Sequence, residues 1–444
     1  MQQDKYRGRS RLAGWLGTGK ETPAAESWEQ DATDAVAYAG KKKKLTIGKL
    51  DAQSALLLIE NMLFAAANAL SGTFVSIYLW KAKSDFAMIG WFTLTHQLAM
   101  ALTFWAAGKW VKEHNKMNCL RAGVVMSAVF YLLVLMLGLS SVNYIFLLGA
   151  VQGMASGFFW LAFNIVYFEV TSRETRDKFN GWAGLLGAGV GMLAPWISGL
   201  IIVHMAGTAG YRVIFSISLG IFVLGVAVSF FLKKRKIEGT YGWTYGFRHL
   251  RQGNTPWRPV CAALMAQGFR EGVFGFMISL LVYIATTSEQ KLGSYALVTS
   301  GVSFVSFWLV GRVLKPKYRS RGMLVGVLMV IAAILPFFWK VNFMTLLVFG
   351  IGTSLFLPLF TIPMTSSVFD LIGRDEESVK HREELVILRE LALNAGRILG
   401  TLLFIAVVSQ STSPMVINTL LLVIGSAPFL SWLFMRKVLH PENS

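Results

Sequence analysis

Long apolar stretches recur along this chain, and they limit its fold more than any other sequence feature. Between Leu56 and Leu433, successive stretches approach the roughly 20 residues that one helix needs to cross a bilayer. Charged residues make up only 15% of the 444 residues, which is too little to cover the surface of a soluble domain. Lipid is therefore the expected solvent, and the chain is predicted to be an all-α membrane protein.

Twelve transmembrane helices are expected, in two sets of six. The predicted spans are 52–80, 86–108, 120–139, 144–170, 181–205 and 212–232, followed by 258–285, 292–313, 322–339, 343–370, 383–409 and 414–435. The predicted parts are a tail 1–49, a six-helix bundle 50–232, a connector 233–257, a second six-helix bundle 258–437 and a tail 438–444. The first tail is polar and lacks the apolar core of a signal peptide. The connector is expected to be either an amphipathic segment at the membrane interface or a plain tether.

Basic residues are distributed unevenly between the two sets of loops. One set, with the segments that flank the spans, holds Lys41–Lys44, Lys109, Lys112, Lys116, Arg121, Arg173, Arg176, Lys178, Lys233, Lys234, Arg235, Lys236, Lys315, Lys317, Arg319, Arg321, Arg374, Lys380, Arg382, Arg436 and Lys437. The opposite loops hold Lys81, Lys83, Arg212, Lys291 and Lys340. Positive charge resists translocation, so both termini are predicted to be cytoplasmic, in the cell (inner) membrane. This placement explains the net charge of +18 without a nucleic-acid partner.

The two halves of the sequence repeat each other. With a shift of about 203 positions, four glycines of the first half fall on glycines of the second: Gly72, Gly90, Gly108 and Gly123 on Gly275, Gly293, Gly311 and Gly326. A parallel repeat of six spans predicts two six-helix bundles related by a pseudo-twofold axis along the membrane normal.

The repeat and the loop after the second span resemble the major facilitator superfamily. That family has the signature G-x-x-x-D-R-x-G-R-R in this loop and a weaker copy after the eighth helix. This chain has Gly108 and Lys116 in the first copy, and Gly311 and Arg319 in the second. Lys112 and Lys315 stand where the signature acid belongs, so the family's acid-to-helix-end latch is not carried over to either loop. The resemblance covers about residues 50–437 and is closest to bacterial efflux-type or glycolipid-flippase-like members.

The resemblance implies a central cavity lined by helices one, four, seven and ten and flanked by two, five, eight and eleven. Ionisable groups at bilayer depth are costly and need a function or a partner. The candidates for proton coupling or substrate binding are Glu60, His96, Arg270, Glu271, Glu390, Asn394 and Arg397. Of these, Glu60 and Glu271 are the proton-coupling candidates, and the two arginines would hold a negative charge; structural ion pairs are the alternative. The candidate cavity-lining residues are Asn61, Asn68, Gln152, Trp160, Asn164 and Gln267.

Charged residues at the cytoplasmic helix ends are candidates for a gate between the halves. They are Glu169, Arg173, Arg176, Asp370, Arg374 and Glu383. Opposite charges could join the halves in one state and separate in the other. Weak, solvated surface pairs are the alternative.

The predicted function is secondary active transport of a small organic or amphipathic solute, proton-coupled and of the efflux type. The alternatives are a lipid or glycolipid flippase and, from other classes, a non-transporting receptor or an intramembrane enzyme. The sequence contains no G-x-x-x-x-G-K-[ST] loop for an ATPase. Cys119 and Cys261 lack metal-type spacing, so neither a metal nor a cofactor is expected. The expected partners are protons, membrane lipids and a small-molecule or lipid-like substrate, with the protein a monomer.

Overall fold

The computed structural model describes residues 52–170, 173–233, 240–251, 255–374, 376–436 and 438–439. The predicted tail 1–49 lies outside the described residues, as does the predicted tail 438–444 beyond residue 439.

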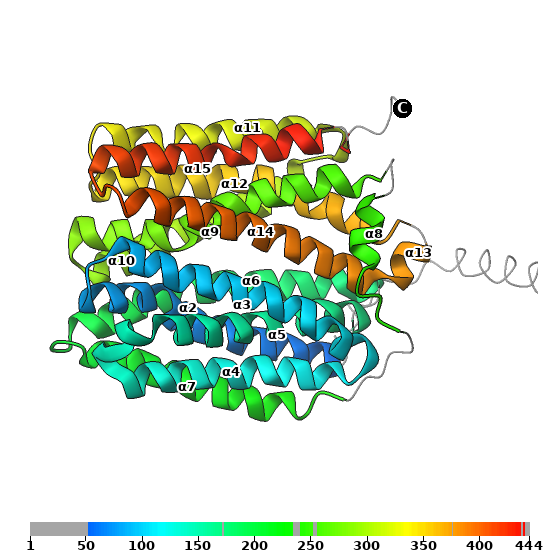
Figure 1. The fold of residues 1–444 in the computed structure, drawn as a ribbon, viewed down its shortest axis with the longest axis horizontal. Coiled ribbons are helices and arrows are strands. Elements are labelled where there is room, and N and C mark those ends of the chain that lie inside the picture. The colour runs from blue at the N-terminus through cyan, green and yellow to red at the C-terminus, as the bar shows by residue number, and fades with distance from the viewer. Residues whose placement is uncertain are drawn as a thin grey trace, which may run out of the picture. The chain divides into compact units, whose positions relative to one another are not determined.

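Twelve long helices make up most of the described chain (Figure 1). The first six are α2 (Ala52–Ala82), α3 (Phe86–Glu113), α4 (Lys116–Leu137), α5 (Ile145–Val170), α6 (Arg173–Val203) and α7 (Ala209–Ser229). The second six are α9 (Trp257–Thr286), α10 (Glu289–Val313), α11 (Arg319–Ala332), α12 (Phe343–Ile372), α14 (Arg382–Val408) and α15 (Pro414–Met435). Each predicted span coincides with one of these helices, so the predicted all-α membrane fold is confirmed.

The two largest differences from the predicted boundaries have identifiable reasons. Helix α6 begins at Arg173 rather than at 181, because polar residues ahead of an apolar span can still continue its helix. Helix α11 ends at Ala332, and the chain continues through a short 3-10 helix, Leu335–Phe338. Pro336 explains this change, since it has no backbone N–H to extend an α-helix.

Ten segments of the described chain are long and apolar enough to cross a membrane. One of them, Lys116–Tyr167, contains both α4 and α5, and α3 is not among the ten. Helix α3 has 28 residues, but polar side chains such as His96 and Gln97 interrupt its apolar sequence. These polar residues lie in a helix that packs against both α5 and α14.

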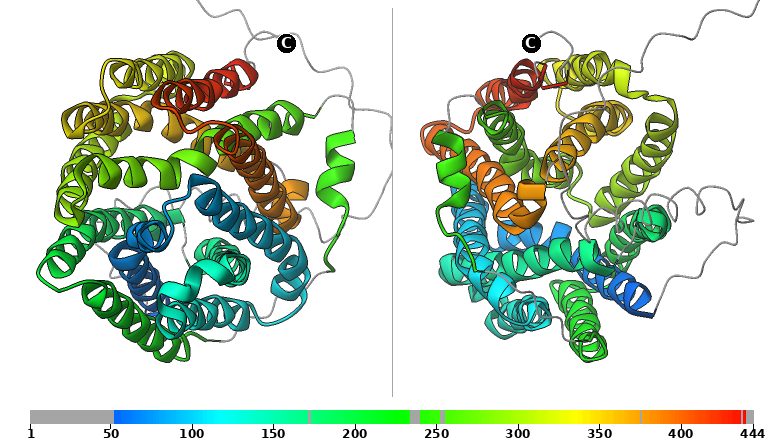
Figure 2. Two further views of the ribbon diagram at one scale, coloured as in Figure 1. Left: turned by 60° about the vertical axis from the view of Figure 1, so that its left-hand side comes forward. Right: turned by 90° about the vertical axis from the view of Figure 1, so that its right-hand side faces the viewer.

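The helix contacts reproduce the internal repeat. In the first half, α2 contacts α6 and α7, α3 contacts α5, and α4 contacts α5 and α7. In the second half, α9 contacts α14 and α15, α10 contacts α12, and α11 contacts α12 and α15. Every one of these pairs has its counterpart six spans later, so the predicted relation between the halves is confirmed. The halves meet mainly where α3 packs on α14 and α6 packs on α10 (Figure 2).

Two short helices mark one end of the helix bundles. Helix α8 (Tyr245–Arg251) belongs to the connector, and α13 (Glu376–Lys380) precedes α14. Both lie at the same end (Figure 1). We call this the connector end and the opposite one the far end.

Glycines bring α9 and α14 into backbone contact. A Cβ atom added at Gly396 would collide with the Met265 carbonyl oxygen, and one added at Gly268 would collide with the Leu393 carbonyl oxygen. Small residues at such crossings allow helices to pack closely where lipid provides no hydrophobic drive for association. The crossing fixes the side chains of α9 relative to those of α14.

Gly396→Val should therefore destabilise the fold by about 1–3 kcal/mol or more, since the new side chain meets backbone that cannot move aside. Gly220→Val on α7 is the matched control, because no described atom lies within 4 Å of a Cβ there. Thermal unfolding of the purified protein in detergent measures both. Equal melting temperatures for the two variants would contradict the proposed crossing.

Candidate functional site

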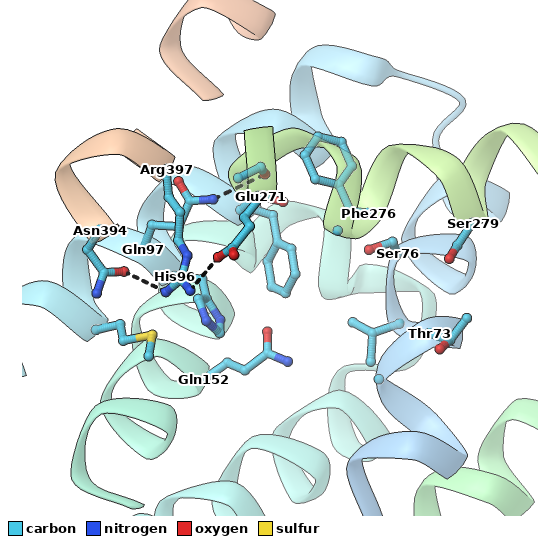
Figure 3. Close-up of a pocket in the computed structure, with 17 residues that line it drawn as sticks. Thr73, Ser76, His96, Gln97, Gln152, Glu271, Phe276, Ser279, Asn394 and Arg397 are labelled. Carbon is cyan, nitrogen blue, oxygen red and sulfur yellow. Dashed lines mark hydrogen bonds and ion pairs between the residues drawn. The ribbon is translucent and has the colours of Figure 1, made fainter. Parts of the chain in front are cut away.

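A cavity of about 280 Å³ lies between the two halves (Figure 3). Helices α2, α3 and α5 of the first half line it, together with α9 and α14 of the second. Its polar lining residues are Thr73, Ser76, Thr93, His96, Gln97, Gln152, Glu271, Ser279, Asn394 and Arg397. Phe92, Met100 and Phe276 add apolar surface. A concave site with a few convergent polar groups is the usual form of a small-molecule binding site.

An ion pair between α9 and α14 forms the charged part of the cavity wall. Arg397 donates from Nη2 to Glu271 Oε2 at 2.8 Å. The Glu271 side chain is 34% exposed and the Arg397 side chain 23%, so a solute in the cavity can reach both groups. Gln267 donates to the other Glu271 oxygen at 2.7 Å, and Arg397 Nη1 donates to Asn394 Oδ1 at 3.4 Å. Each charged group therefore has a second partner that holds it.

The opposite wall comes from the first half and is uncharged apart from the titratable His96. His96 and Gln152 lie side by side there (Figure 3). Gln97 joins the halves directly, because its Nε2 donates to the Gly272 carbonyl at 3.2 Å and its Oε1 accepts from the Thr401 hydroxyl at 3.0 Å. Gln97 was not among the candidates, because uncharged polar residues were sought on the helices expected to line the cavity and Gln97 lies in the second span. Its position next to His96 in a predicted span was the available signal.

Four of the seven proton-coupling or substrate-binding candidates thus meet at the cavity: His96, Glu271, Asn394 and Arg397. The other three lie elsewhere. Glu60 is fully buried inside the first half, facing Val124 of α4 and Gly225 of α7, and neither carboxyl oxygen has a hydrogen-bond partner in the described chain. The roles of all seven candidates, inside and outside the cavity, stay predictions.

Arg270 and Glu390 also lie away from the cavity lining. The Arg270 guanidinium lies 4.5 Å from the centre of the Phe274 ring. Glu390 pairs with its neighbour Arg389, and its backbone carbonyl accepts from Asn394. Neither residue is among those that line the cavity.

The uncharged candidates divide in the same way. Gln152 lines the cavity, and Gln267 supports Glu271. Asn68 bonds within its own helix, to the Phe64 carbonyl, and Trp160 packs edge-on against Phe64 and Phe163. Asn61 and Asn164 are half-buried on α2 and α5, outside the cavity lining.

The contact between the halves at the connector end differs from the predicted gate. The side chains of Glu169, Arg173 and Arg176 lie outside the described residues. Asp370 pairs with Arg319 of its own half at 3.0 Å, and Arg374 is exposed. Glu383 is the predicted gate residue that lies at a contact between the halves.

Lys112 makes this contact. Its Nζ donates to Glu384 Oε1 at 2.6 Å and to Oε2 at 2.8 Å, and lies 4.0 Å from Glu383. All three side chains are buried. Lys112 stands where the family signature has its acid, so the pair joins α3 to α14 with reversed polarity. The substitution is evident in the sequence, but its partner Glu384 is not.

The connector packs onto the same contact. The Gly242 N–H donates to Glu384 Oε1 at 3.1 Å, and the Tyr241 N–H donates to Glu113 Oε1 at 3.0 Å. Burial, with the nearby Glu384 carboxylate, raises the pKa of the Tyr241 hydroxyl. The Tyr245 ring stacks on His381 with 3.9 Å between ring centres. Residues 240–251 are therefore fixed to both halves rather than being a plain tether.

A second ion pair joins the halves at the far end. Lys81 at the end of α2 donates to Glu289 at the start of α10 at 2.7 Å. The Tyr211 hydroxyl of α7 donates to the same Glu289 oxygen at 2.9 Å. In the sequence, Lys81 was considered only as one of the few basic residues of its set of loops, not as a partner of Glu289.

The seam between α6 and α10 is closed over part of its length. Toward the far end, the Ser300 hydroxyl donates to the Gly191 carbonyl at 3.2 Å. Toward the connector end, Gly184 and Gly187 have no described atom within 4 Å of an added Cβ. Trp182 and Trp308 there are 52% and 54% exposed. The α3–α14 seam, by contrast, is in contact from Gly90 to Lys112.

Comparison with known proteins gives consistent matches. The model of the Major Facilitator Superfamily matches residues 57–377. The chain is 38% identical over 406 residues to the uncharacterized protein YqgE of Bacillus subtilis (strain 168), covering 90% of this chain and 94% of that one. It is 42% identical over 160 residues to an uncharacterized protein in the sodM 3' region of Geobacillus stearothermophilus, and this match covers 36% of this chain and 75% of that one.

Solved structures of a bacterial homologue of the iron transporter ferroportin share the fold. The inward-facing state has a TM-score of 0.65 and 16% identity, and covers 88% of this chain and 100% of that one. The outward-facing state with soaked iron has a TM-score of 0.61 and 16% identity, and covers 87% and 98%. At this identity the likeness concerns the fold alone.

Lys112→Ala should lower stability by about 3–5 kcal/mol, because it leaves buried carboxylates without their cation. Lys109→Ala is the matched control: Lys109 is half-exposed and lies 3.8 Å from Glu113, so its loss should cost at most about 1 kcal/mol. Adding Glu384→Gln to Lys112→Ala should restore part of the loss, since it removes the orphaned charge. Thermal unfolding of the single and double variants measures this coupling, and additive effects would exclude it.

Proposed function

Because this chain belongs to the Major Facilitator Superfamily, we propose that it is a secondary active transporter that moves a small organic or amphipathic solute by alternating access. The family and the shared transporter fold indicate a multi-pass membrane transporter, not an enzyme. The observation that carries the proposal is the polar cavity between the halves, with the Glu271–Arg397 pair in its wall. Rocking of the two halves would expose such a site to each side in turn.

The place of Glu271 supports our proposal of proton coupling of the efflux type. Its carboxylate is reachable from the cavity and is bound to Arg397 and Gln267. A proton on Glu271 would remove the charge that holds Arg397, and it would also remove the carboxylate as a partner for the solute. Proton and solute thus compete for one group, which is the condition for exchanging one against the other. Glu60, remote from the cavity lining, stays a second candidate.

An organic solute suits this cavity better than a metal ion. Glu271 already faces the Arg397 guanidinium at 2.8 Å, so a divalent cation there would be repelled by a positive charge at short range. The iron of the ferroportin homologue is therefore not carried over to this chain.

One observation favours the second candidate function, a lipid or glycolipid flippase. Toward the connector end of the α6–α10 seam, Gly184 and Gly187 of α6 have open space beside them, and Trp308 of α10 is exposed. A seam open to the side would admit an amphiphile from the lipid. The cavity favours a solute that is largely polar, and its lining includes no residue of α6 or α10.

We propose that the connector end, and with it both termini, faces the cytoplasm, since the basic loops lie there. The parted α6–α10 seam would then correspond to an inward-facing state.

Glu271→Gln should reduce pH-gradient-driven solute movement by about tenfold or more, because an intramembrane carboxylate that carries the coupled proton has no neutral substitute. Solutes are first found by a thermal-shift screen of amphiphiles, lipids and small metabolites, and transport is then measured in proteoliposomes. Asp85→Asn is the matched control, since Asp85 caps α3 outside the cavity and Asn preserves the cap. Unchanged coupling in Glu271→Gln, with loss in Glu60→Gln, would move the coupling role to Glu60.

The orientation is testable with single cysteines, because Cys119 and Cys261 are buried. In intact cells, a membrane-impermeant maleimide should label Lys340→Cys at the far end but not Lys317→Cys at the connector end; both native side chains are exposed. Permeabilised cells should show labelling of both. The reverse pattern in intact cells would place the connector end outside.

A further inference from the structure

We infer that the transported solute is a zwitterion, or has a zwitterionic group, with one cationic and one anionic group of its own. Arg397 would hold the anionic group and Glu271 the cationic group. This inference rests on the proposed function, because it assumes that the cavity between the halves is the solute site.

The charge balance of the cavity carries the argument. Its lining contains one carboxylate, Glu271, and one guanidinium, Arg397, only 2.8 Å apart. The other polar lining groups are amides, hydroxyls and the titratable His96. A solute with a single charge would be attracted by one member of the pair and repelled by the other at similar range. In a site shielded from water, the remaining uncompensated charge is costly.

A zwitterion avoids this cost by exchanging partners. Its cationic group takes the place of the guanidinium on Glu271, and its carboxylate or phosphate takes the place of the carboxylate on Arg397. Arginine suits this role because its planar N–H groups bind a carboxylate or phosphate in a bidentate manner. No charge is left unpaired before or after binding.

The surroundings of the pair fit such an exchange. Gln267 is bonded to Glu271 and Asn394 to Arg397, so each charged group would keep one partner if the pair separated. Gly72 and Gly275, which occupy equivalent positions in the repeat, line the cavity and have no described atom within 4 Å of an added Cβ. Open space therefore lies beside the charged pair.

The apolar lining limits the rest of the solute. Phe92, Met100 and Phe276 offer apolar contact, and a volume of about 280 Å³ is at the lower end of small-molecule sites. A free amino acid with a compact apolar side chain fits this description. So does the zwitterionic headgroup of a lysophospholipid, whose chain would have to leave the cavity. Both present the same ammonium and acid chemistry.

The test uses solutes that differ in charge alone. Leucine, its methyl ester and N-acetylleucine are respectively a zwitterion, a cation and an anion of nearly one shape. Alanine and phenylalanine repeat the series at other sizes. Fluorescent lysophosphatidylethanolamine and lysophosphatidylglycerol provide the same contrast for a lipid, zwitterionic against anionic. Binding of the amino acids is measured by thermal shift on the full-length protein, and lipid movement is measured in proteoliposomes.

The wild-type protein should bind the zwitterion at least about tenfold more tightly than either singly charged analogue of the same series. The preferences of two variants should then reverse. Glu271→Gln leaves a net positive wall and should favour N-acetylleucine, whereas Arg397→Gln leaves a net negative wall and should favour the methyl ester. If the pair had only a structural role, each variant would bind all three ligands more weakly and by a similar factor. Selective movement of lysophosphatidylethanolamine, with no amino acid bound, would identify the lipid as the source of the zwitterion.

Equal or tighter binding of a singly charged analogue by the wild-type protein overturns the inference, as does a series in which no zwitterion binds. Should either variant fail to fold, the relative binding of the zwitterion and its two singly charged analogues by the wild-type protein still tests the inference. The experiments can also distinguish an error in this inference from an error in the proposed function. A singly charged solute that moves with the pH gradient through Glu271 leaves transport standing, whereas no gradient-driven movement of any solute removes both.

Discussion

The site depends on the backbone contact between α9 and α14. Glycines on both helices make this contact possible, and the same crossing sets Glu271 against Arg397. Helix α14 also packs on α3, where it carries Glu384 toward Lys112. One helix therefore supplies the cation of the cavity, an uncharged link to Gln97 through Thr401, and the acid at the connector end. A charge at bilayer depth is tolerated only when a partner is held in place, and this packing holds it.

Much of the fold was predictable because its cause is local. A span must be apolar over a nearly fixed length, so most of the twelve helices can be located from their composition. The repeat was predictable from its paired glycines, of which Gly123 and Gly326 lie against the backbone of a neighbouring helix, whereas Gly72 and Gly275 line the cavity. Glu271 and Arg397 stood out because charges are rare in spans. Their pairing, however, depends on the crossing angle and register of two helices that are more than a hundred residues apart in the sequence.

Physical reasons also explain why the sequence could not place the other charged residues. Glu60 and Arg270 are as ionisable as Glu271, but the rotation of each helix about its axis turns them away from the cavity lining, and composition does not determine that rotation. Lys112 was recognised as a departure from the family signature, yet its role required knowing that Glu384 lies opposite. A lysine bound to a buried carboxylate thus joins the halves at the position where the signature has its acid.

The difference between the two seams has a consequence for the surrounding bilayer. The α3–α14 seam is closed, whereas toward the connector end of the α6–α10 seam Gly184 and Gly187 have open space beside them and Trp308 is exposed. In a bilayer, hydrocarbon from the neighbouring leaflet fills such a gap, and closing the gap must displace it. In the proposed alternating-access mechanism, the work of closure would then include the lateral pressure of that leaflet. Lipid composition would thus enter the free-energy difference between the two proposed states, beside the proposed proton and solute.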